Sequence, residues 1–237
     1  MSEGPYQEWA ANRSDARFTE WLRHTAGEPW QEAVGHRFTE ELGMGALEPA
    51  TFRIYLVQDF VFLEHLVGAF GRAVADAPTM STKRRLVGFL DVLTDEENDY
   101  FERAFDALDV EIETSMTVPT SGPTAAFVDL LEAASRMGGY AETLAVLVPA
   151  EWIYAEWATR VQSYETTDEL PFYYREWVDL HATADFRSFV SWMRGQLDDI
   201  GPTHSIRRQQ QIQRLFTRTV HLEVAFFDMA YADGAAR

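Results

Sequence analysis

Apolar side chains recur every three or four residues along most of the chain, which is the spacing of one face of an α-helix. The clearest case is the segment 49–77. Pro49 opens it, and proline suits a first helical turn because the N–H that it lacks has no helical partner there. The segment therefore predicts one long helix with a broad buried face, whose apolar positions are Phe52, Tyr55, Leu56, Phe60, Leu63, Leu66, Val67 and Phe70.

Similar patterns predict helices on both sides of this segment, and strand signals are scarce. Residues 113–123 are rich in Thr, Ser and Pro and predict a surface loop. No shift in composition marks a domain boundary, so we expect an all-α fold, a compact bundle of seven to eight helices in a single domain, residues 1–237. The predicted helices cover residues 15–25, 29–42, 49–77, 81–108 with a restart at the capping-box pattern 94–97, 125–136, 141–163, 171–200 with a break near Ala184, and 205–232.

The charge balance is strongly acidic. Lys and Arg number 20 against 38 Asp and Glu, a net charge of −18 at pH 7, and such a field repels nucleic-acid phosphates and anionic lipids. Lys83 is the only lysine, and the acids are dispersed along the chain. This pattern favours a halophilic protein whose self-repulsion is screened by molar salt, and the alternative is an acidic surface for a cationic partner. Neither nucleic acid nor a membrane is an expected partner.

The sequence also bears on location and redox chemistry. No uninterrupted apolar run reaches the ~18 residues that span a bilayer, and the first residues, MSEGPYQEWAANRSD, lack the basic and apolar regions of a signal peptide. The absence of cysteine excludes disulfides, cysteine-ligated metals and thiol nucleophiles. We therefore expect a cytoplasmic protein, and we predict no cofactor and no metal.

Four polar residues lie on otherwise apolar helix faces, where an unpaired carboxylate costs several kcal/mol of stability. Asp59 follows Tyr55 by four residues and Glu151 precedes Tyr154 by three, so each pair shares a face. A carboxylate is especially costly within the apolar segment 220–227. The four polar residues are Asp59, Glu151, His181 and Glu223.

Three segments resemble, in order, the motifs of one known family. Residues 52–60 (FRIYLVQDF) resemble the F-x-x-Y-x-x-Q-D-[YF] signature of the TenA (thiaminase II) family. Residues 147–154 (LVPAEWIY) resemble its L-x-P-C-x-W-x-Y segment, and residues 223–231 (EVAFFDMAY) its closing E-x₅-M-A-Y. Each motif alone is mainly a helix-core pattern, but their common order and spacing over most of the chain identify the chain as similar to this family.

The resemblance implies a heme-oxygenase-like fold and hydrolysis of thiamin, or of aminomethylpyrimidine fragments of degraded thiamin, to hydroxymethylpyrimidine for salvage. Asp59 matches the family's aspartate that hydrogen-bonds the aminopyrimidine, and Tyr154 matches a tyrosine near the nucleophile. Glu223 matches the glutamate proposed as proton donor to the leaving group. The family forms tetramers, so the resemblance also implies a homo-oligomer, a tetramer, with a small pyrimidine as its substrate.

Three positions depart from the family pattern. The nucleophilic cysteine falls on Ala150, a tyrosine beside the substrate on Phe62, and the tyrosine that stacks on the pyrimidine on His181. In a branch of the family that lacks this cysteine, a glutamate acts in its place. Glu151 directly follows Ala150 and is therefore the candidate for that role. We therefore predict a hydrolase that cleaves a C–N bond with the help of carboxylates. The predicted catalytic residues are Glu223, Glu151 and Asp59. The predicted pyrimidine-binding residues are Asp59, Tyr154, Phe62, His181 and Tyr55. Thiazolium, ammonia and formamide are all compatible leaving groups.

Other interpretations stay open at this point. A di-iron oxidase or oxygenase of the same fold would need a Glu with a His seven residues later, but Glu97 is followed at that distance by Ala104. A non-catalytic pyrimidine-binding protein is the third interpretation. Among single residues, Asp59 could accept a hydrogen bond between helices, Glu223 could pair with Arg53, and Glu151 could lie on a solvated face.

Overall fold

The computed structural model describes residues 4–111, 119–164 and 170–232. All regular structure in these ranges is helical, which confirms the all-α prediction. The elements are α1 (Pro5–Ala10), α2 (Phe18–Ala26), α3 (Glu28–Val34), α4 (Arg37–Gly43), α5 (Pro49–Asp76), α6 (Met80–Thr94), α7 (Glu96–Ala107), α9 (Gly122–Met137), α10 (Tyr140–Gln162), α11 (Phe172–Ala182), α12 (Ala184–Ile200), the short 3₁₀ helix η2 (Gly201–Thr203) and α13 (Ile206–Ala232).

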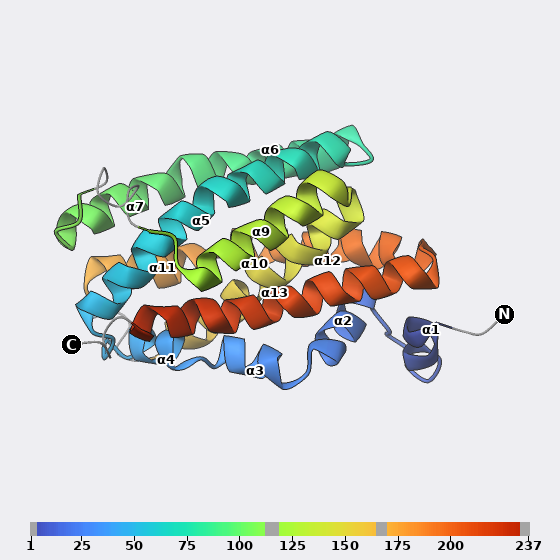
Figure 1. The fold of residues 1–237 in the computed structure, drawn as a ribbon, viewed down its shortest axis with the longest axis horizontal. Coiled ribbons are helices and arrows are strands. Elements are labelled where there is room, and N and C mark those ends of the chain that lie inside the picture. Colours follow the sequence, from blue (N-terminus) through green and yellow to red (C-terminus); the bar gives the residue numbers. More distant parts are fainter. Residues whose placement is uncertain (1–3, 112–118, 165–169, 233–237) are drawn as a thin grey trace.

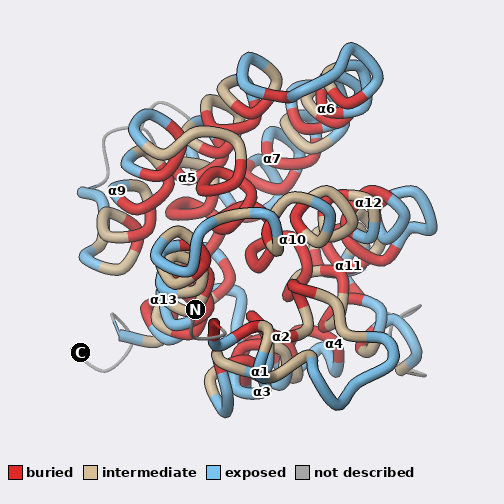
Figure 2. Tube along the Cα trace, turned by 90° about the vertical axis from the view of Figure 1, so that its right-hand side faces the viewer, coloured by how far each residue is buried: buried red, intermediate tan, exposed pale blue. Residues whose placement is uncertain are grey.

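The long helices α5, α9, α10 and α13 lie alongside one another at the centre of the bundle (Figure 1). Helices α5 and α6 form an antiparallel pair along one side, and α2, α3 and α4 lie along the opposite side under α13. Helix α10 contacts α5, α9, α11, α12 and α13, so neighbours surround it. Figure 2 shows the result, with buried residues on the inward sides of the helices and exposed residues on the outward sides.

The central position of α10 follows from its sequence. Every residue from Ala141 to Ile153 is buried, whereas a surface helix keeps one polar face. A charged side chain on this helix must therefore find a partner inside the protein or line an internal cavity. Glu142 and Glu151 are the two acids in this buried stretch.

Several helix starts agree with local capping chemistry. The side chains of Thr79, Ser121 and Thr183 accept hydrogen bonds from the backbone N–H groups of the first turns of α6, α9 and α12, and each satisfies one otherwise unpaired helix donor. The cap at Thr183 explains the predicted break near Ala184. Of the predicted loop 113–123, residues 113–118 lie outside the described ranges.

The N-terminal region is divided more finely than the sequence pattern predicts. The helix predicted over 29–42 is two helices, α3 and α4, because the first ends at Gly35 and His36 caps the second. The His36 Nδ1 atom accepts a hydrogen bond from the backbone N–H of Phe38 at 3.1 Å. Helix α1 was not predicted, because six residues are too short for a periodic pattern. The bundle therefore has more helices than the seven to eight expected.

Helix α5 is the one described helix that is long and apolar enough to cross a membrane by length and composition alone. Its most apolar 18-residue window has a mean hydropathy of 1.3, and 56% of that window is buried inside the molecule. The helix also carries Gln58 and Asp59, both buried. These features are those of the core helix of a bundle.

Candidate active site

An internal pocket lies between the central helices, and it brings together most of the residues that the sequence singled out. Asp59 and Phe62 reach it from α5, Glu151 and Tyr154 from α10, His181 from α11 and Glu223 from α13. Ala150, at the position of the family's cysteine, also lines it. The remaining lining residues are Leu63, Leu66, Leu93, Glu97, Phe127, Trp177 and Phe226.

The carboxyl groups in this pocket lack the partners that buried acids usually have. Glu151 and Glu223 are 6% and 2% exposed, and neither makes a hydrogen bond or an ion pair within the described ranges. The alternatives of a solvated Glu151 and of a Glu223 pair with Arg53 are therefore wrong. Glu142 on the same helix as Glu151 shows the contrast, because Arg208 donates two hydrogen bonds to it at 2.8 and 2.7 Å.

Asp59 has one weak hydrogen-bond partner, and it lies on its own helix. The Tyr55 hydroxyl donates to Asp59 Oδ2 at 3.4 Å and lies 2.6 Å from the Tyr154 hydroxyl. Asp59 therefore does not serve as an acceptor between helices. Tyr55 is fully buried and does not line the pocket. It lies behind the wall, where it holds the positions of Asp59 and Tyr154.

Burial and crowding change the protonation of these acids. Burial raises the pKa of Asp59 to about 8, although the Tyr55 hydrogen bond acts in the opposite direction. Burial also raises the pKa of Glu151 to about 8, and the Asp59 charge adds to the effect. The pKa of Glu223 is raised well above its ordinary value by burial and by the charges of Asp59 and Glu151. This direction favours the protonated form of Glu223, which is the form that a carboxylic general acid needs.

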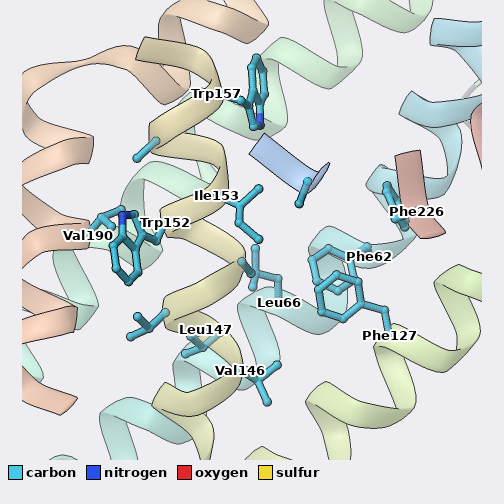
Figure 3. Packing of buried hydrophobic residues seen from close by; sticks show 14 of the residues in the cluster. Phe62, Leu66, Phe127, Val146, Leu147, Trp152, Ile153, Trp157, Val190 and Phe226 are labelled. Carbon is cyan, nitrogen blue, oxygen red and sulfur yellow. The ribbon is translucent and has the colours of Figure 1, made fainter. Parts of the chain in front are cut away.

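Two groups of aromatic side chains line the pocket. In the first, the Phe62 ring lies 4.6 Å from that of Phe127 and 6.1 Å from that of Phe226, measured between centroids, and Figure 3 shows the three beside α10. In the second, the His181 ring lies 4.9 Å from Tyr154 and 4.5 Å from Trp177. A planar aromatic ligand would find flat apolar surfaces on both.

His181 has a fixed tautomer. Its Nδ1 atom lies 2.9 Å from the backbone oxygen of Trp177, and because a carbonyl oxygen only accepts, Nδ1 carries the hydrogen. Burial lowers the pKa of His181 to about 4, so the ring is neutral and Nε2 keeps a free lone pair at neutral pH. His181 is therefore a neutral, buried side chain in the pocket wall, and its Nε2 atom can accept a hydrogen bond.

The sequence analysis missed one acid of the pocket. Glu97, in the first turn of α7, lines the pocket with the three predicted carboxyls. It is one of four acids among residues 95–99, the other three of which are exposed, and such a run is typical of a solvated helix start. The run alone does not show which acid faces inward. The apolar residues that follow could have identified Glu97, because Tyr100, Phe101 and Ala104 lie three, four and seven residues after it on the same helix face. All three are buried.

No group of three or more His, Asp or Glu side chains in the part of the chain that the structure describes is placed to hold a metal ion. The pocket acids are therefore not arranged as a ligand set, although four of them share one cavity. The di-iron alternative gains no support from the geometry.

The raised pKa values have a consequence for stability. An unfolded carboxyl ionises near pH 4, whereas Asp59 and Glu151 stay protonated in the folded protein until about pH 8. The folded state thus binds more protons, so we expect the free energy of unfolding to fall as the pH rises between these values, by about 1.4 kcal/mol per pH unit for each group. Denaturant unfolding at pH 5 to 9 measures the slope. Glu151→Gln should remove one such contribution, and an identical slope in this variant would contradict the assignment.

The fold and the pocket agree with comparisons to known proteins. Residues 23–233 match the model of the TENA/THI-4/PQQC family. Because the match covers most of the chain, the protein belongs to this family. A solved structure of a TenA family transcription regulator from Silicibacter sp. TM1040 superposes with a TM-score of 0.82, at 26% identity over 91% of this chain and 97% of that one.

Two named enzymes and a further solved structure are also similar to this chain. The aminopyrimidine aminohydrolase of Halalkalibacterium halodurans is 26% identical over 85% of this chain and 90% of its own length. The enzyme of the same name from Helicobacter pylori is 24% identical over 90% of this chain and 98% of its own length. A Shewanella denitrificans domain described as having a heme oxygenase-like fold superposes with a TM-score of 0.70 at 12% identity over 94% of this chain and 95% of its own, which confirms the predicted fold.

Proposed function

We propose that this protein hydrolyses the C–N bond of an aminomethylpyrimidine, or of its formylated derivative, to give hydroxymethylpyrimidine, and so serves thiamin salvage. The observation that carries the proposal is the set of buried carboxyls of Asp59, Glu151 and Glu223 in one aromatic-walled pocket, none of which forms an ion pair within the described residues. Membership of the family and the names of the two aminohydrolases support it.

The chemistry does not require a cysteine. The 4-amino group of the pyrimidine can push electron density toward the ring carbon that bears the CH₂–N arm. The amine can then leave with the electron pair of the C–N bond once its nitrogen is protonated, and water adds to the activated methylene. Ala150 is therefore compatible with turnover, because an acid at the departing nitrogen and a base at the attacking water suffice.

The three carboxyls take separate roles. Asp59 pairs with the amidine edge of the ring, where its acid form offers one donor and one acceptor to the ring nitrogen and the amino group. Transfer of that proton to the ring nitrogen makes the pair charge-assisted. Glu223, whose raised pKa favours the acid form, donates a proton to the departing nitrogen. Glu151 positions the attacking water, and its ionised form, which becomes populated as the pH approaches its pKa of about 8, takes the proton of that water.

Incubation of the purified protein with aminomethylpyrimidine, formylaminomethylpyrimidine and thiamin, with products read by mass, tests the proposal. We expect hydroxymethylpyrimidine from at least one of the three. Pyrimidine binding without any product would instead support the non-catalytic alternative, in which the fold is kept to bind the ring.

The solution behaviour is part of the same proposal. We propose a cytoplasmic homotetramer adapted to high salt. The charge of −18 and the single lysine support the adaptation to salt. We expect helix signal and cooperative unfolding to be lost below about molar KCl, because unscreened repulsion then opposes folding. Circular dichroism over a KCl series tests the salt dependence of folding, and light scattering over the same series tests the tetramer. Full stability in dilute buffer would contradict the salt claim, and a monomer in high salt the tetramer.

A further inference from the structure

Gln58, which precedes Asp59 on α5, is a buried polar residue that takes no part in the proposed mechanism. It is 4% exposed, and a buried amide needs hydrogen-bond partners inside the protein. Its Nε2 donates to the backbone oxygen of Pro119 at 3.3 Å, and its Oε1 accepts from the backbone N–H of Ser121 at 2.8 Å. A carbonyl only accepts and an N–H only donates, so these contacts fix the orientation of the amide. Gln58 therefore ties α5 to the segment that leads into α9.

The first turn of α9 is completed by this contact. Ser121 is the N-cap residue, and its Oγ accepts from the backbone N–H of Thr124 at 3.2 Å. In a capping box, a Glu or Gln at the third helical position accepts in return from the N–H of the cap residue. Thr124 occupies that position here, and Gln58 supplies the amide oxygen from α5 instead. The start of α9 is thus capped in part by a neighbouring helix.

Further contacts between α5 and α9 follow in the same order along both helices. The ring of Phe62, four residues after Gln58, lies 4.6 Å from that of Phe127, measured between centroids. His65 Nδ1 then lies 3.3 Å from Glu132 Oε1. The two helices therefore run side by side in the same direction (Figure 1). The Gln58 contacts come first in this row, so they set the register where α9 begins.

The register of α9 determines one wall of the pocket. Helix α9 reaches the pocket through Phe127, which lies beside Phe62 from α5 (Figure 3). Neither ring carries a polar group, so packing alone holds the two together, and a shift of α9 along α5 would move one ring past the other. The three carboxyls with proposed catalytic roles lie on α5, α10 and α13. Such a shift would alter the surface for a planar ring and leave the acids in place.

We propose that Gln58 is a positioning residue for pyrimidine binding, which fixes the register of α9 against α5 and so holds Phe127 beside Phe62 as a flat surface for the ring. This inference rests on the proposed function, because that function supplies the ring. Two consecutive residues of α5 then serve the two parts of recognition. Asp59 pairs with the edge of the ring, and Gln58 maintains the surface that contacts its face.

Gln58→Leu keeps the approximate size of the side chain and removes both hydrogen bonds. The probe is the 5-methyl analogue of aminomethylpyrimidine, a neutral compound with no C–N bond on its arm, and tryptophan fluorescence reports its binding because Trp177 lines the pocket. We expect its dissociation constant to rise about tenfold in Gln58→Leu. Gln211→Leu, at an exposed position on α13, is the matched control and should stay within about twofold of the wild type. Equal affinity in Gln58→Leu and the wild type would overturn the role of Gln58.

Steady-state kinetics distinguish positioning of the ring from a general loosening of the site. We expect KM to rise about tenfold in Gln58→Leu and kcat to stay within about threefold of the wild-type value, because the acids do not lie on α9. A fall in kcat as large as the rise in KM would show that Gln58 supports the whole site. That result would overturn its assignment to the ring-binding wall.

Two variants of Ser121 test the same link from the other side, and they decide the matter if Gln58→Leu does not fold. Ser121→Pro removes the N–H that donates to Gln58, and the φ of −64° at Ser121 suits proline. Ser121→Ala is the matched control, because it loses the same capping hydroxyl and keeps the N–H. We expect Ser121→Pro to bind the analogue about fivefold more weakly than Ser121→Ala does. Equal affinities of these two variants would overturn the link.

The outcome for Gln58 is distinguishable from the outcome for the hydrolase. Weaker binding in Gln58→Leu, together with no turnover of any pyrimidine by the wild type, would overturn the hydrolase proposal alone. Turnover by the wild type with unchanged affinity in Gln58→Leu would overturn the positioning role alone. No binding of the analogue by the wild type would overturn both.

Discussion

Replacement of Glu223 by Gln should lower the turnover of an aminomethylpyrimidine by about 10²- to 10⁴-fold, the usual effect of losing a general acid. Burial, and after it the charges of Asp59 and Glu151, raise the pKa of Glu223 and so favour its acid form in the folded protein. Glutamine has nearly the same shape and still donates a hydrogen bond, but it cannot deliver a proton to the departing nitrogen. The loss should therefore fall on kcat.

Steady-state kinetics and a separate binding measurement check this prediction. Glu223→Gln should bind the neutral 5-methyl analogue about as tightly as the wild type does, which shows that the pocket is intact. Asp228→Asn is the matched control, because Asp228 lies on the same helix, is exposed and pairs with His36, which does not line the pocket. Unchanged kcat in Glu223→Gln would remove Glu223 from the mechanism.

Replacement of Asp59 by Asn should weaken pyrimidine binding by about 10- to 100-fold, the difference between a charge-assisted and a neutral hydrogen-bonded pair. The asparagine amide fits the same space, but it cannot transfer a proton to the ring nitrogen. Asp59 also gives the Tyr55 hydroxyl its acceptor at 3.4 Å, a geometry that an amide oxygen can keep. The loss should thus appear in the dissociation constant of every pyrimidine, whatever its arm.

Titration of the 5-methyl analogue into Asp59→Asn and wild type measures the effect without turnover. Asp91→Asn, at an exposed position on α6, is the control for an Asp-to-Asn replacement outside the pocket. Equal affinity in the wild type and Asp59→Asn would show that Asp59 does not hold the ring. A fall for charged ligands only would mean that Asp59 recognises the arm.

The sequence predicts the long helices and the inward-facing acids well, for a physical reason. A helix buried on one face must place apolar residues every three or four positions, so Asp59 and Glu223 stand out wherever they interrupt that spacing. The predicted start of α5 at Pro49 and the break before Ala184 both agree with the structure. These features depend only on local periodicity and capping.

Features that depend on neighbouring helices were not predicted. Glu97 faces the pocket because of how α7 packs against α11 and α5, and a run of acids at a helix start carries no sign of that. Tyr55 shares the face of Asp59, but whether it lines the pocket or lies behind it depends on Tyr154 from α10. The short helices α3 and α4 divide at His36, whose ring caps the second helix in place of the usual Ser or Asp.

A single-turnover incubation in H₂¹⁸O, with excess protein over aminomethylpyrimidine, tests the central claim that the pocket carboxyls direct water to the methylene without a covalent intermediate. We expect hydroxymethylpyrimidine that carries ¹⁸O in the first turnover, together with one equivalent of ammonia. Product with ¹⁶O would show that a carboxylate oxygen of the protein, such as that of Glu151, had bonded to the methylene. That result, or no product from a pocket that binds the pyrimidine, would contradict the mechanism.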